Sequence, residues 1–140
     1  MQLPDVSQST LLPRKMSRRN RILFVDDEPS IRLTLPPVLE QHGFEVKAAG
    51  TVADAVAEIK ASRFDVLISD LNIEEGGDGL RIVGAMRENQ PHCITLILTG
   101  YPGFDTAVDA LRLRVDDYVV KPVDVETLVS SLRSRLAKKN

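Results

Sequence analysis

Short apolar runs that end in a charged or hydroxyl-bearing residue dominate the pattern of this chain. Four of the runs are uniformly apolar, which is typical of strands buried on both faces of a parallel sheet. A fifth segment alternates apolar and polar residues, as a half-exposed edge strand does. We therefore expect five parallel strands, over residues 21–26, 44–48, 64–69, 94–98 and 117–120.

Segments with apolar residues at helical spacing separate these strands. Pro29 suits the first turn of a helix. Asp124 is a suitable N-cap for a final helix in which Leu128, Leu132 and Leu136 lie one turn apart. We expect five helices, over residues 29–42, residues 52–62, a segment that carries Leu80, Val83 and Met86, residues 104–112 and residues 124–137.

The alternation of strands and helices predicts an α/β fold with right-handed crossovers and helices on both faces of the sheet. The most polar strand, residues 44–48, belongs at an edge, which favours the order 2-1-3-4-5 of a doubly wound, flavodoxin-like sheet. Residues 1–20 lack this periodicity and carry a basic cluster, so we expect a flexible N-terminal tail. Residues 21–140 are expected to form one domain, with no DNA-binding module after the last helix.

Composition narrows the classes of function. The 140 residues are 43% hydrophobic and 27% charged, which is typical of a globular protein. The net charge is −2 and the body outside the basic tail is acidic, so we expect no direct binding of nucleic acid. No apolar stretch is long enough to span a membrane, and the N-terminus lacks the apolar core of a signal peptide. The single cysteine, Cys93, excludes an internal disulfide and indicates a reducing compartment, so we expect a cytoplasmic protein.

Polar groups follow four of the strands, at the edge of the sheet where parallel strands all end. Asp26 and Asp27 follow the first strand, Asp70 the third, Thr99 the fourth and Lys121 the fifth. Ligands bind at this edge beside the point where the strand order reverses, here between the first and third strands. Three neighbouring carboxylates repel one another unless a cation lies between them, and hard oxygen ligands suit Mg²⁺, with Mn²⁺ as an alternative.

The residues around Asp70 favour phosphoryl transfer to a carboxylate. Lys121 supplies a compact positive charge for one phosphate oxygen, and the Thr99 hydroxyl can donate to another. A metal ion, an ammonium group and hydrogen-bond donors around a carboxylate stabilise a phosphoryl group during its transfer. Asp70 stands centrally, between the acidic pair and Thr99, so we expect it to be the nucleophile and phosphoacceptor.

Together these segments resemble the receiver domain of bacterial two-component response regulators, the CheY-like superfamily. The resemblance covers the chain from Arg21 to about Leu136. Each motif alone is weak, but the set is specific because the motifs follow one another in order and at these spacings. The matching segments are residues 22–29 (ILFVDDEP), 64–71 (FDVLISDL), 78–80 (DGL), 98–100 (LTG) and 117–122 (DYVVKP).

The resemblance implies a role for each residue of the acidic cluster, which consists of Asp26, Asp27 and Asp70, and for the neighbouring Asn72. Asp70 would accept a phosphoryl group from a phosphohistidine donor. Asp27 and Asp70 would bind Mg²⁺ directly, and Asp26 largely through water. Asn72 would bind the ion through its main-chain carbonyl.

The same resemblance implies a switch. Thr99 and Lys121 would hold the phosphoryl oxygens, and Tyr118 would turn inward when Thr99 moves. The readout would lie on the face formed by helix 4, strand 5 and helix 5, which is also the surface through which a dimer would form.

The implied partners are a sensor histidine kinase or a histidine phosphotransfer protein, and a downstream protein target. Apart from the resemblance, the position of Tyr101 two residues beyond Thr99 leads us to expect that it shields the phosphoryl group from water.

Three features depart from the family pattern. The loop after Asp70 is one residue longer than usual and carries Glu74 and Glu75, which either tune the metal site or form a solvated acidic loop. Arg114 stands where the family usually has glycine, so it either costs up to about 1 kcal/mol in a left-handed turn or forces a different turn. The prolines at 36–37 interrupt the first helix and predict a kink or a loosened turn.

Rival interpretations stay open on the sequence alone. One is a receiver excised from a hybrid kinase or a transcription factor, and another is a degenerate receiver that binds partners without phosphate. A haloacid-dehalogenase-like phosphatase also uses an aspartate nucleophile and Mg²⁺, but it needs an Asp-x-Asp spacing where this chain has adjacent Asp26 and Asp27. We therefore expect a signalling domain rather than an enzyme, with self-catalysed phosphorylation and dephosphorylation of Asp70 at most.

Overall fold

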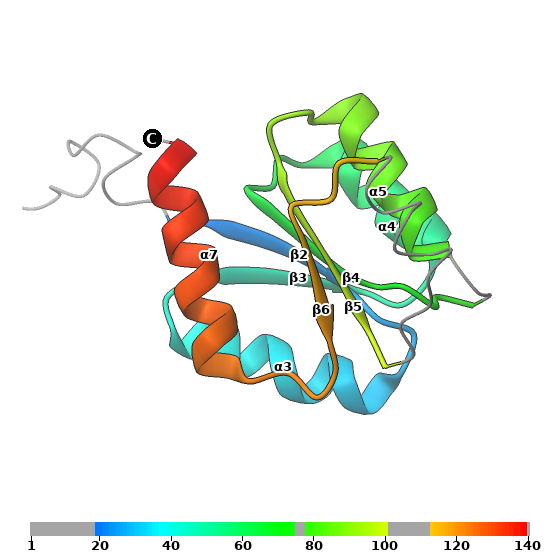
Figure 1. Ribbon diagram of the computed structural model, residues 1–140. Helices are drawn as coiled ribbons and strands as arrows, with labels where there is room; N and C mark the ends of the chain where they lie inside the picture. The colour runs from blue at the N-terminus through cyan, green and yellow to red at the C-terminus, as the bar shows by residue number, and fades with distance from the viewer. Residues whose placement is uncertain (1–18, 75–77, 101–112, 140) are drawn as a thin grey trace, which may run out of the picture.

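The computed structural model describes residues 19–74, 78–100 and 113–139. Its sheet has the order β3-β2-β4-β5-β6 with all neighbouring strands parallel (Figure 1), which in chain order is the predicted 2-1-3-4-5. The most polar strand, β3, lies at an edge, as expected. The five strands are Arg21–Val25 (β2), Glu45–Ala49 (β3), Val66–Asp70 (β4), Ile94–Thr99 (β5) and Asp117–Val120 (β6).

Helices cover both faces of the sheet. The helices within the described residues are Pro29–Gln41 (α3), Val52–Ala61 (α4), Asp78–Asn89 (α5) and Val125–Lys139 (α7). Helices α4 and α5 pack on one face, and α3 and α7 pack on the other (Figure 1). None of these four is both long enough and apolar enough to cross a membrane. The predicted helix over 104–112 and most of the predicted tail lie outside the described residues.

Alternate residues of the buried strands contribute to two separate cores. Leu23 and Val25 of β2 belong to the core beneath α4 and α5, whereas Ile22 and Phe24 belong to the core beneath α3 and α7. All four side chains are fully buried. Side chains alternate along a strand with a period of two. A residue's position along its strand therefore decides which face its side chain occupies.

Helix α3 continues through Pro36 and Pro37 as one helix. Pro36 and Leu39 are both buried, and Leu39 belongs to the core that α3 shares with α7. This packing offsets the backbone hydrogen bonds that the two prolines cannot make. The helix is therefore not interrupted at these residues, and the kink of its axis stays a prediction.

The turn before β6 has the left-handed backbone that glycine would favour. The sequence allowed either a left-handed turn at Arg114 or a different turn. Arg114 has a φ of 59°, so the left-handed turn is the one found. The Arg87 guanidinium in α5 donates to the carbonyl oxygens of Leu113, at 3.4 Å, and of Arg114. It also lies 3.4 Å from the Asp116 carboxylate, which accepts from the Thr95 N–H at 2.8 Å. These bonds hold the start of β6 against β5.

Candidate functional site

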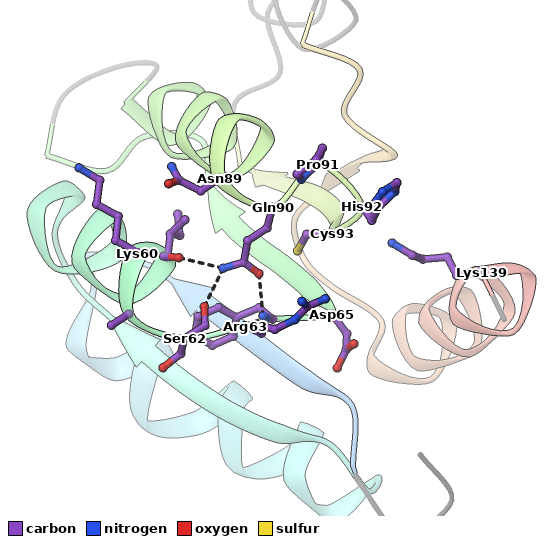
Figure 2. Close-up of a pocket in the computed structure, with 13 residues that line it drawn as sticks. Lys60, Ser62, Arg63, Asp65, Asn89, Gln90, Pro91, His92, Cys93 and Lys139 are labelled. Carbon is purple, nitrogen blue, oxygen red and sulfur yellow. Dashed lines mark hydrogen bonds between the residues drawn. The ribbon is translucent and has the colours of Figure 1, made fainter. Parts of the chain in front are cut away.

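A cavity of about 500 Å³ opens at the edge of the sheet where the strands begin (Figure 2). Within it, Gln90 Nε2 donates to the carbonyl oxygens of Ile59 and Ser62, at 2.8 and 2.6 Å. Gln90 Oε1 accepts from the Phe64 N–H at 2.8 Å. These bonds satisfy backbone groups at and beyond the C-terminal end of α4, where helix carbonyls lack intrahelical partners. Burial raises the pKa of the Cys93 thiol to about 12, so the thiol stays protonated at neutral pH and has a structural role here.

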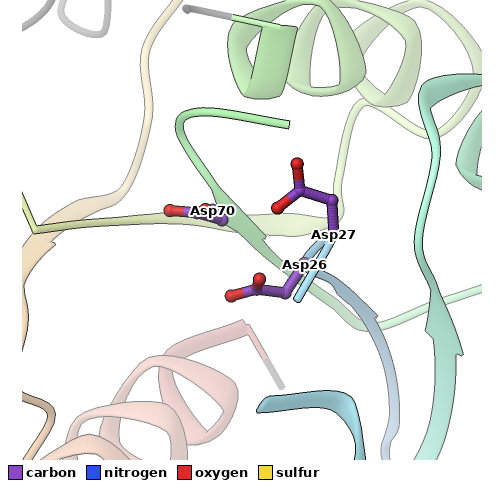
Figure 3. A group of neighbouring side chains, drawn as sticks. All are labelled: Asp26, Asp27 and Asp70. Atoms are coloured by element: carbon purple, nitrogen blue, oxygen red, sulfur yellow. The ribbon is translucent and has the colours of Figure 1, made fainter. Parts of the chain in front are cut away.

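Three aspartates lie together at the opposite end of the sheet, where the strands end (Figure 3). Asp26 and Asp27 directly follow β2, and Asp70 is the last residue of β4, whereas the predicted strand ended one residue before it. Carboxylate oxygens of the three residues lie within 4.8 Å of one another. Asp26 is fully buried, Asp70 is 8% exposed and Asp27 is exposed. The predicted meeting of these residues is therefore found.

The alternation of side chains explains why Lys121 reaches two of the three aspartates. By the alternation of side chains along β2 and β4, Asp26 and Asp70 fall on the face of the sheet that α3 and α7 cover. Val119 of β6 packs on that same face. Lys121 lies two residues beyond Val119, so its side chain follows on the same side. The Lys121 Nζ is 3.4 Å from Asp26 Oδ2 and 3.4 Å from Asp70 Oδ1.

Burial and charge act in opposite directions on Asp70 and Lys121. Burial raises the pKa of Asp70, and the Lys121 ammonium offsets only part of this rise, to which Asp26 and Asp27 add. Burial by itself lowers the pKa of Lys121, but the charges and hydrogen bonds of Asp70 and Asp26 outweigh it, so the pKa of Lys121 is raised. The lysine therefore stays charged, but the negative charge of the three clustered carboxylates exceeds its single positive charge.

The donor set of this cluster fits a hard divalent cation. Its three candidate ligands are all carboxylates, and such oxygen donors suit Mg²⁺ or Mn²⁺ better than softer metals. A divalent ion among them would also offset the excess of negative charge. Asn72, the fourth predicted ligand, is exposed and lies in the loop two residues beyond Asp70. Its main-chain contact with the ion stays a prediction.

Thr99 and Tyr118 lie together on neighbouring strands. Thr99 ends β5 and is fully buried, and Tyr118 in β6 is half-buried against the core beneath α4 and α5. Ile97 pairs with Tyr118, and Thr99 lies two residues beyond Ile97, so both side chains occupy one face of the sheet. The Lys121 N–H donates to the Thr99 carbonyl at 2.7 Å, which joins the ends of the two strands. The two residues of the predicted pair therefore lie on one face of neighbouring strands, and the movement of Tyr118 stays a prediction.

Glu74 connects the loop after β4 to two neighbours. Its N–H donates to Asp27 Oδ2 at 2.9 Å, and its Oε1 accepts from the N–H of Val52, the first residue of α4, at 2.8 Å. Glu74 therefore contacts a candidate metal ligand, and its tuning of the metal site stays a prediction. The other predicted tuning residues, Glu75 and Tyr101, lie outside the described residues.

Arg32 and Gly79 also shape the site, and the sequence did not reveal their roles. Arg32 Nη1 in α3 donates to the main-chain carbonyl of Asp26 at 2.7 Å. A Cβ at position 79 would clash with the Asp70 carbonyl oxygen, so only glycine lets α5 begin this close to β4. The DGL motif includes Gly79, but the sequence alone does not show that glycine is needed there for the close approach to Asp70. Arg32 is the only cationic residue in α3, which is the signal that could have singled it out.

Comparison with known proteins places the chain beside bacterial regulators. Residues 22–133 match the sequence family described as the response regulator receiver domain. Over 117 residues the chain is 34% identical to the photosynthetic apparatus regulatory protein RegA of Cereibacter sphaeroides. This alignment covers 84% of the chain and 62% of RegA, so the chain spans less than two thirds of that relative's length.

Solved structures of response regulators share the fold. A response regulator receiver domain protein (CheY-like) from Methanospirillum hungatei JF-1 matches with a TM-score of 0.81 and 27% identity, covering 86% of this chain and 95% of that one. A response regulator from Burkholderia pseudomallei, solved with a phosphorylated aspartic acid, a calcium ion and citrate, matches with a TM-score of 0.75 and 29% identity. The second match covers 85% of this chain and 69% of the other.

Proposed function

The chain belongs to the response regulator receiver domain family, and on that premise we propose that it accepts a phosphoryl group on Asp70 from a phosphohistidine. The proposed donor is a sensor histidine kinase or a histidine phosphotransfer protein. The observation that carries the proposal is the position of Lys121, whose ammonium lies 3.4 Å from the carboxylates of both Asp26 and Asp70. A cation held there can neutralise an oxygen of a phosphoryl group on Asp70. The phosphorylated aspartic acid of the Burkholderia pseudomallei response regulator supports the same chemistry.

The proposed step exchanges a P–N bond for a P–O bond. An oxygen of the ionised Asp70 carboxylate attacks phosphorus, and the bond from phosphorus to the donor's imidazole nitrogen breaks. The imidazole leaves with the bonding electron pair and is then protonated by solvent. Asp26, Asp27 and Asp70, with the main-chain carbonyl of Asn72, would hold Mg²⁺ or Mn²⁺, which when bound offsets the charge on the transferring oxygens.

The proposed switch follows from the residues beside Asp70. The Thr99 hydroxyl and the Lys121 ammonium bind the phosphoryl oxygens once these are attached to Asp70. Phosphorylation adds about −1.5 to −2 charge, which favours the arrangement in which both contacts are made. Because Thr99 and Tyr118 share one face of the sheet, a shift of Thr99 changes the packing of Tyr118. The readout is the face that includes β6 and α7, where a downstream protein target or a second copy of the chain binds.

The setting of this domain is part of the proposal. In it, residues 21–140 act as the phospho-accepting domain, as the sequence predicts. A second candidate is a receiver that belongs to a larger regulator. The alignment covers only 62% of RegA, so this relative is longer than the part that the chain matches, which favours the second candidate. The acidic body argues against direct contact with nucleic acid, and the single cysteine argues for a cytoplasmic location.

Incubation with acetyl phosphate and Mg²⁺, followed by intact-mass measurement, tests the proposal. The wild-type chain should gain one phosphoryl group, and neither the Asp70→Asn variant nor the wild type in EDTA should gain it. Asp54→Asn, on the exposed surface of α4, is the matched control and should be phosphorylated like the wild type. A folded wild-type chain that gains no mass would contradict the proposal and favour a degenerate receiver that binds partners without phosphate.

A further inference from the structure

We propose that Glu74 is a positioning residue that orients Asp27 toward the metal ion by anchoring the loop after β4 to the start of α4. The inference deepens the proposed function and rests on it, because it concerns the same metal site. It assigns a task to a residue by which this chain departs from the family pattern. Three observations carry it, one on Asp27, one on the Glu74 backbone and one on the Glu74 side chain.

The first observation is that Asp27 is held by a hydrogen bond rather than by packing. Asp26 is fully buried beside it, and its carboxylate accepts from the Glu28 N–H at 2.9 Å. Asp27 is exposed, so surrounding side chains do not confine its carboxylate. The Glu74 N–H donates to Asp27 Oδ2 at 2.9 Å. The orientation of this ligand therefore depends on where the loop holds Glu74.

The second observation is the backbone conformation of Glu74. Its φ is 64°, in the left-handed region that residues with a side chain rarely adopt. Such a conformation persists only where surrounding contacts hold it. Here the conformation directs the N–H toward Asp27 while the side chain reaches α4.

The third observation is the contact that holds Glu74 in place. Glu74 Oε1 accepts from the N–H of Val52, one of the backbone donors that lack an intrahelical partner at the start of α4. A negative charge at this end of a helix is also favoured by the helix dipole. Thr51 caps the same helix end from within, because its Oγ1 accepts from the Asp54 N–H at 3.0 Å. The two caps serve one helix, but only Glu74 also contacts the acidic cluster.

Replacing the Glu74 side chain should therefore change metal binding. We would titrate the full chain with Mg²⁺ and follow its backbone amide signals by NMR, which needs no phosphorylation. Glu74→Ala and Glu74→Gly should each weaken Mg²⁺ binding about threefold to tenfold, as expected for the loss of one hydrogen bond. Glu74→Gln keeps the acceptor oxygen and should bind Mg²⁺ close to the wild-type affinity.

Two comparisons make this test decisive. Glycine relaxes the left-handed backbone, so wild-type affinity in Glu74→Gly would show that the side chain is not needed and would overturn the inference. Thr51→Ala removes the other cap of α4 and should leave Mg²⁺ affinity unchanged, whereas an equal loss there would reduce Glu74 to a helix cap. Mg²⁺ binding that none of the Glu74 variants alters would overturn this inference alone. A wild-type chain that does not bind Mg²⁺ would overturn the metal site of the proposed function as well.

Discussion

The Lys121 Nζ lies 3.4 Å from Asp70 Oδ1, across the intervening strand β5. The carboxylate ends the central strand β4, and the ammonium directly follows the edge strand β6. Burial disfavours the charged form of Asp70 and Lys121 favours it, so the stability of the chain and the proposed chemistry depend on the same contact.

Asp70→Asn should stabilise the metal-free fold at neutral pH. Burial raises the pKa of Asp70 above its ordinary value of 3.8, so the folded chain binds this proton more tightly than the unfolded chain does. The stability that Asp70 contributes is therefore present at low pH and is lost as the pH rises from 3.8 through the raised folded pKa. Asparagine cannot ionise and avoids this loss.

Thermal denaturation in EDTA checks this prediction. The melting temperature of Asp70→Asn should exceed that of the wild type at about pH 7, and the difference should shrink toward about pH 3, where both chains are uncharged at this position. A gain of equal size at both pH values would show that ionisation of Asp70 is not its cause.

Mg²⁺ should stabilise the wild-type fold through Asp27. A ligand that binds only the folded state at ten times its dissociation constant stabilises it by about 1.4 kcal/mol. Asp27→Asn removes one carboxylate of the cluster and should lose most of this gain, whereas Asp54→Asn should keep it. Melting curves with increasing Mg²⁺ measure the effect, and an undiminished gain in Asp27→Asn would contradict the assigned ligand.

Lys121→Met should tighten Mg²⁺ binding and slow phosphorylation. The ammonium competes with a cation for the Asp26 and Asp70 carboxylates, so its removal leaves more negative charge for the metal ion. The phosphoryl group loses its positive partner, which should slow transfer from acetyl phosphate about a hundredfold. Lys47→Met, which removes a surface lysine 3.6 Å from Glu58, is the charge-matched control and should change neither quantity. Parallel losses of affinity and rate in Lys121→Met would instead indicate a general disruption of the site.

Gly79→Ala should destabilise the chain. The new Cβ would clash with the Asp70 carbonyl oxygen, and overpacking of this kind costs about 1–3 kcal/mol. Gly84 lies in the same helix, and a Cβ added there would meet no atom of another element within 4 Å. Gly84→Ala should therefore stabilise the chain by about 0.5–1 kcal/mol. Urea unfolding of both variants measures the two free energies, and equal changes would contradict the close approach of α5 to β4.

The strand order was enough to predict most of the site. Parallel strands end at one edge of a sheet, so residues that follow them must meet, and Asp26, Asp70 and Lys121 do. The left-handed turn at Arg114 was one of two outcomes that the sequence allowed, and the Arg87 contacts that accompany it come from a different element.

Contacts made by loops and helices could not be predicted in the same way. The bond from Glu74 to Val52 depends on how the loop after β4 lies against α4, and no periodicity in the sequence encodes that placement. Arg32 reaches the Asp26 carbonyl only because α3 packs beside the end of β2. Both contacts follow from tertiary packing, which local patterns do not determine.

Chemical location of the phosphoryl group shows whether Asp70 is the phosphoacceptor. After incubation with acetyl phosphate and Mg²⁺, borohydride reduction converts an aspartyl phosphate to homoserine, which peptide mass mapping then locates. We expect homoserine at position 70 and at no other aspartate, and none in Asp70→Asn. Homoserine at Asp26 or Asp27, or a phosphoryl group retained on a residue other than Asp70, would contradict the account.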